Sequence, residues 1–94
     1  MKNQMLQVAK YTAAYLRDEL KYAPKLKKVT DDIFEVIVNE KEYMLSPGEV
    51  EGTIRVSGGH GCEVKFSLGD DKLVGVVCAM AIETFLLVSK LKDC

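Results

Sequence analysis

The chain is poor in the residue types that build metal centres and covalent active sites. It has one histidine and three cysteines among 94 residues. Cys62, Cys78 and Cys94 are odd in number and show no paired spacing. A structural zinc site needs four ligands, and neither Cys78, in an apolar helix stripe, nor Cys94, at the chain end, is placed to join His60 and Cys62. We therefore expect no metal site and no cofactor, and unpaired cysteines favour a reducing, cytoplasmic location.

The chain also lacks an excess of either charge and a recognisable targeting segment. The chain has 13 Lys and Arg residues and 14 Asp and Glu residues, so its net charge is −1. A charge this small sets up no long-range field that would attract nucleic acid. The first residues lack the apolar stretch of a signal peptide. The lysines between Lys21 and Lys28 leave phosphate or nucleic-acid binding as a lesser alternative. Lysines at a helix C-terminus complement its dipole, so no nucleic-acid partner is expected.

What the chain does have is the periodicity of a single α+β domain over residues 1–94. Residues 2–22 repeat apolar side chains at three- and four-residue spacing, as one helix face does. Residues 73–91 predict a second helix, with Asp70 or Asp71 at its N-cap. Between the helices lie four segments with strand composition, at 32–39, 41–45, 50–57 and 62–68. The expected fold is α-β-β-β-β-α, a four-stranded antiparallel meander with both helices on one face.

The second predicted helix is apolar nearly all round. Of the 16 residues from Leu73 to Val88, 13 are hydrophobic. On a helical wheel they fall into three stripes, of which the sheet and the first helix would cover two. The third stripe then requires a partner subunit, and a homodimer is the commonest assembly. We expect this third stripe to form the interface, through Gly75, Ala79, Ile82 and Leu86.

Two other interpretations of this helix remain open. In a monomer, the loop at residues 23–32 would cover the third stripe. A membrane span needs about 18–20 apolar residues, and this run is shorter and contains Glu83, so no membrane is expected.

Three tyrosines lie close together on the first predicted helix. Tyr11, Tyr15 and Tyr22 fall on the side of the helix away from Ala9 and Leu16. Tyrosine is common at interfaces, so these residues are candidates for a second contact surface. The alternative is that the three rings lie half-exposed with their hydroxyls in water.

The stretch VSGGHGCEV, residues 56–64, looks most like a binding loop. His60 with Gly58, Gly59 and Gly61 is the candidate ligand-binding set. A loop that binds the phosphates of a nucleotide leads into a helix, whereas this loop leads into a predicted strand. We therefore predict a hairpin turn here. Two registers match the strand faces. One places Arg55 opposite Glu63 and is favoured, and the other places Arg55 opposite Lys65, a like charge.

The sequence predicts no catalytic residues, because no nucleophile, base and orienting group stand in a recognisable context. The leading hypothesis is a small, non-catalytic cytoplasmic domain that acts as a homodimer and binds a partner protein or small ligand. The alternative is a small enzyme or metal-dependent protein that uses the loop around His60.

Overall fold

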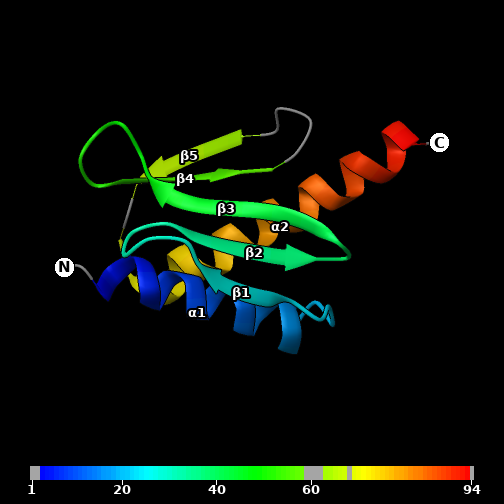
Figure 1. Ribbon diagram of the computed structural model, residues 1–94, viewed down its shortest axis with the longest axis horizontal. Coiled ribbons are helices and arrows are strands. Elements are labelled where there is room, and N and C mark those ends of the chain that lie inside the picture. The colour runs from blue at the N-terminus through cyan, green and yellow to red at the C-terminus, as the bar shows by residue number, and fades with distance from the viewer. Residues whose placement is uncertain (1–2, 59–62, 68, 94) are drawn as a thin grey trace.

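The computed structural model describes residues 3–58, 63–67 and 69–93. Its elements in chain order are α1 (Asn3–Asp18), β1 (Lys25–Lys28), β2 (Phe34–Val38), β3 (Lys41–Pro47), β4 (Thr53–Ser57), β5 (Glu63–Ser67) and α2 (Asp71–Asp93). The strands form one antiparallel sheet in the order β1-β2-β3-β4-β5 (Figure 1). The predicted α+β meander with a helix at each end is confirmed, and the sheet has one strand more than expected.

The additional strand, β1, lies in the segment expected to be a loop. All four of its residues are exposed, so its sequence carries no alternation between buried and exposed side chains. It is held by pairing with β2, where Leu26 lies opposite Val36 and Lys27 opposite Glu35. Its three lysines suit an edge strand, because charged side chains discourage pairing with another chain.

One face of the sheet is apolar and packs under both helices. Residues on β2, β3 and β4 alternate between buried and exposed positions, as a sheet with one covered face requires. β5 is covered less completely, and its inward Val64 and Phe66 are half-buried. The buried strand residues are Phe34, Val36, Val38, Tyr43, Leu45, Ile54 and Val56.

The two helices run in the same general direction and touch at Gly75 (Figure 1). A Cβ atom at Gly75 would collide with the Cβ of Tyr11 and lie 3.1 Å from the backbone nitrogen of Thr12. Gly75 therefore permits the close approach of α1. Thr12 is buried at this contact, and its hydroxyl donates to the Val8 carbonyl at 2.8 Å within its own helix.

The longer helix, α2, projects beyond α1. A helix rises 1.5 Å per residue, so the 23 residues of α2 span about 35 Å and the 16 residues of α1 about 24 Å. Figure 1 shows the C-terminal part of α2 extending past the end of α1. At the other end, the Asp70 carboxylate accepts a hydrogen bond from the Leu73 amide at 3.1 Å, which confirms the predicted N-cap.

The favoured register of the β4–β5 hairpin was wrong. Arg55 pairs with Lys65, and Ser57 pairs with Glu63, as in the second register. The Glu63 carboxylate resolves the expected repulsion, because it lies 2.5 Å from the Arg55 guanidinium and 3.6 Å from the Lys65 ammonium. β4 also begins at Thr53, since Gly52 adopts a φ of 81° in the preceding turn.

Candidate interaction surface

A stripe of large apolar side chains on α2 is left uncovered by the residues that the structure describes. We name it the α2 stripe, and its apolar members are Leu73, Val77, Met80, Leu87 and Leu91. Their exposed fractions run from 39% at Val77 to 77% at Leu91. Thr84 lies within the stripe, and its hydroxyl donates to the Met80 carbonyl at 2.9 Å. A contiguous row of this kind on a small protein is typical of an interaction site rather than of scattered surface residues.

The stripe expected to meet a second subunit lies inside the chain instead. Its four residues lie on the inner face of α2 and are buried against α1 and the sheet: Gly75, Ala79, Ile82 and Leu86. The small residues Gly75 and Ala79 do allow another helix to approach, but the structure places α1 of the same chain there. Small residues indicate that a helix–helix contact exists, and they do not indicate which helix makes it.

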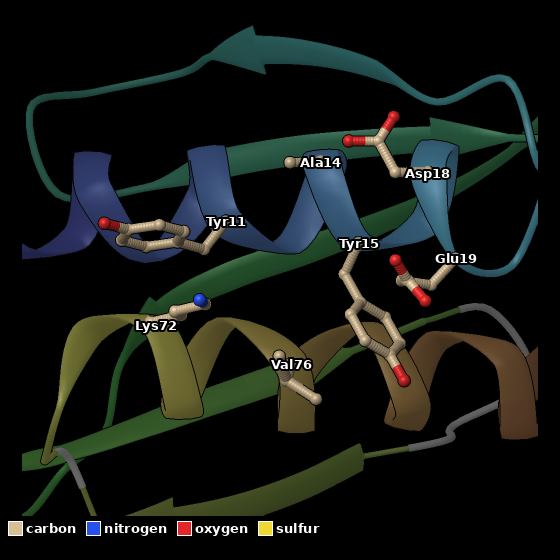
Figure 2. A pocket seen from close by; sticks show the side chains of 7 residues that line it. All are labelled: Tyr11, Ala14, Tyr15, Asp18, Glu19, Lys72 and Val76. Atoms are coloured by element: carbon tan, nitrogen blue, oxygen red, sulfur yellow. The ribbon is translucent and has the colours of Figure 1, made fainter.

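Beside the α2 stripe runs a groove between the two helices. It is lined by Tyr11, Ala14, Tyr15, Asp18, Glu19, Lys72 and Val76, and has a volume of about 150 Å³ (Figure 2). Figure 2 shows the Tyr15 ring reaching from α1 toward α2. Pockets for drug-sized ligands and cofactors are usually about 300–1,000 Å³, so this groove suits a single side chain of a binding partner.

Of the three predicted tyrosines, the structure brings two to this groove. Tyr11 is 39% exposed and Tyr15 is half-buried. Tyr22 is half-buried against the core and does not line the groove. The first helix ends at Asp18, before Tyr22, so the wheel that aligned the three residues does not apply there.

The charged groups of the groove lie at its rim. The Arg17 guanidinium donates to the Asp18 carboxylate at 3.0 Å, and this hydrogen bond lowers the pKa of Asp18 below its ordinary value. Lys72, from the first turn of α2, lines the groove together with Tyr11. The groove thus combines aromatic surfaces with both signs of charge, a composition that fits contact with another protein.

The predicted ligand loop falls mostly outside the described residues. Gly59, His60, Gly61 and Cys62 are not among them, so the proposed role of His60 stays a prediction. Gly58 is described, and a Cβ atom there would lie 2.7 Å from the Tyr43 ring. Tyr43 in turn stacks on Phe85 of α2, with 6.1 Å between ring centroids. Gly58 therefore lets the backbone after β4 approach the Tyr43 ring closely.

Other titratable groups lie outside this groove. The buried Cys78 thiol has its pKa raised to about 12 by burial, and a hydrogen bond with Thr12 opposes this shift only in part. On the outer sheet face, partial desolvation and the neighbouring Glu42 raise the pKa of Glu35. The positive charge of the segment from Lys21 to Lys28 is partly neutralised, because the Lys28 ammonium nitrogen lies 3.0 Å from a carboxylate oxygen of Asp31.

Within the described residues, no group of three or more His, Cys, Asp or Glu side chains is arranged to hold a metal ion. The same residues contain one helix, Asp71–Leu91, that is long and apolar enough to cross a membrane by length and composition. Of the apolar window that meets this criterion, 39% is buried inside the molecule.

Comparison with known proteins places the chain in no family. No family model matches it, and neither a curated protein nor a solved structure is significantly similar to it.

Proposed function

We propose that this protein is a small, non-catalytic domain that acts as a homodimer and binds a partner protein. The observation that carries the proposal is the α2 stripe, whose five apolar side chains are 39–77% exposed in the isolated chain. Exposed apolar surface costs free energy in water, roughly 25 cal/mol for each Å². A second protein surface removes this cost, and the homodimer is the commonest way in which soluble chains supply one.

The groove beside the stripe supports the binding part of the proposal. Tyr11 and Tyr15 offer aromatic surface with polar tips, and such side chains are enriched at protein interfaces. The groove volume of about 150 Å³ favours an inserted side chain over an enclosed metabolite.

The test is the solution mass of the full chain at micromolar concentration, measured by size exclusion with light scattering. The dimer predicts 21 kDa, twice the chain mass of 10.5 kDa. Leu87→Glu places a charge in the stripe at a half-exposed position, so it should fold and elute as a monomer. Val50→Glu is the matched control, because Val50 is 70% exposed in the turn before β4 and should leave the dimer intact.

Two results would contradict the proposal. One is a wild-type mass of 10.5 kDa at this concentration. The other is a Leu87→Glu variant that keeps the dimer mass, since the contact would then lie elsewhere. Flotation of the wild-type chain with phosphatidylcholine vesicles, in place of self-association, would assign the stripe to a lipid surface.

A further inference from the structure

The geometry points to a specific occupant of the α2 stripe: we propose that a second copy of this chain packs its own α2 antiparallel against it. The two-fold axis passes between Met80 and Thr84. This inference rests on the proposed homodimer and adds its architecture. It follows from the spacing of the stripe, the length of α2 and the surface left uncovered.

The spacing of the stripe is that of a coiled-coil seam and is symmetric. Its positions are separated by four, three, four, three and four residues, the alternation that places side chains along one seam of two packed helices. The series reads the same from either end. Reversing the helix therefore lays the stripe on itself in register, with Leu73 opposite Leu91, Val77 opposite Leu87, and Met80 opposite Thr84 of the second copy.

The polar member of the stripe fits this arrangement. The Thr84 hydroxyl already donates to the Met80 carbonyl of its own helix at 2.9 Å. Burying Thr84 in the seam therefore leaves no donor unpaired, and its methyl group meets Met80 of the second copy. A parallel pair would instead place Thr84 opposite Thr84 and align the two helix dipoles, which is less favourable.

The overhang of α2 explains why a second copy is needed. α1 ends seven residues after Tyr11, whereas α2 continues for 18 residues beyond Gly75, so the part of α2 that extends past α1 carries Leu87 and Leu91, the latter 77% exposed. No described element of the same chain covers these side chains. In the antiparallel pair, each overhang packs on the first half of α2 in the second copy, where α1 supports it from the other side. Each chain thus covers what the other leaves open.

The uncovered surface reaches the lower limit for a specific interface between two chains. The stripe and Tyr11 leave on the order of 500 Å² of side-chain surface open, so two copies bury roughly 1,000 Å² from these residues alone, the size at which specific interfaces begin. Val76 and the charged residues flanking the seam, Lys72, Glu83 and Lys90, form the rim.

Cysteine cross-linking tests the orientation. The background carries Cys62→Ser and Cys94→Ser, while Cys78 stays because it is buried. Val77→Cys and Leu87→Cys are made separately and together, and treated with a short bis-maleimide. In the antiparallel pair, residue 77 meets residue 87, whereas two copies of residue 77 lie about 15 Å apart along the helices.

We expect neither single variant to form a covalent dimer. The double variant should convert almost fully to covalent dimer, and an equimolar mixture of the two single variants should convert up to half of its chains. Covalent dimer from Val77→Cys alone would indicate a parallel pair and overturn the inference. A dimer mass by light scattering with no cross-link in any sample would overturn the antiparallel seam and leave the homodimer standing. A monomer mass would overturn both.

Discussion

At the scale of single residues, Gly75 permits a close contact between the two helices that a side chain at this position would obstruct. Its Cα hydrogens face the backbone of α1, and a Cβ atom would meet Tyr11 and Thr12. The nearest atoms belong to the main chain and to a Cβ, which cannot rotate away as the tip of a side chain can. The contact between the two helices, and with it the groove of Figure 2, depends on this position.

Gly75→Ala should therefore lower the free energy of unfolding by about 1–3 kcal/mol, the usual cost of overpacking, despite the better helix propensity of alanine. Urea denaturation at one fixed protein concentration measures the change. Gly69→Ala is the matched control, since a Cβ there meets nothing within 4 Å, and it should change stability by less than about 0.5 kcal/mol. Equal effects of the two substitutions would show that the helices do not meet at Gly75.

Cys78 makes the stability depend on pH in the alkaline range. Burial raises the pKa of its thiol to about 12 in the folded chain, whereas an unfolded cysteine titrates near 8.5–9. Between these values the unfolded state has lost the proton and the folded state has kept it. The unfolded state binds fewer protons there, so the contribution of Cys78 is fully present below about pH 8.5 and declines as the pH rises toward 12.

Relative to Cys78→Ala, the wild-type chain should thus lose about 1.4 kcal/mol of stability for each pH unit between about 9 and 12. Denaturation curves at pH 8, 9, 10 and 10.5 measure this difference, and the titration of lysine and tyrosine side chains cancels between the two proteins. The advantage of the wild type over the variant should shrink along the series. An advantage that stays constant would mean that the thiol is accessible to water.

At the scale of elements, the sequence predicted what its periodicity encodes. Helix α1, the strands β2 to β5 and helix α2 were all expected, because apolar residues recur there with the period of a helix or a strand. β1 was missed since its four exposed residues carry no such period, and the strand exists only through pairing with β2. An edge strand of this kind is specified by its neighbour.

The hairpin register shows a second limit of sequence patterns. Both registers put apolar side chains on the same face, so the alternation alone could not choose between them. The choice made from charge considered only directly opposite residues, Arg55 with Glu63. In the observed register, the Glu63 carboxylate reaches diagonally to Arg55 and along its own strand to Lys65, and forms an ion pair with each of them.

The candidate site was predicted in part. The sequence predicted that one chain cannot cover α2, and it proposed Tyr11, Tyr15 and Tyr22 as a separate contact surface; the structure brings only Tyr11 and Tyr15 to the groove beside α2. The sequence analysis chose the wrong stripe. It assigned the contact at Gly75 and Ala79 to a helix of a partner subunit, whereas in the structure α1 of the same chain packs there. Which stripe remains open depends on where α1 lies across α2, and this position is a tertiary property that no local pattern contains.

At the scale of the whole molecule, the proposed antiparallel pair brings one acidic side chain, Glu83, close to the same residue of the second copy. Glu83 is half-buried at the rim of the α2 stripe, one residue from the point where the two-fold axis crosses the helix. The axis therefore brings Glu83 of the two copies near each other on the same side of the seam. Two carboxylates in this position repel, so the proposed homodimer has to form in spite of this cost.

Glu83→Lys should turn this repulsion into a preference for mixed dimers. The variant alone again places like charges at the axis, whereas a dimer of one wild-type and one Glu83→Lys chain places opposite charges there. Native mass spectrometry of an equimolar mixture of ¹⁵N-labelled wild type and unlabelled variant should show clearly more mixed dimer than the statistical half. Labelled and unlabelled wild type, as the control, should give the statistical value, and about 1 M salt should abolish the excess. In a parallel pair Glu83 would face the apolar Val88 of the second copy, so a statistical distribution at low salt would place the axis elsewhere.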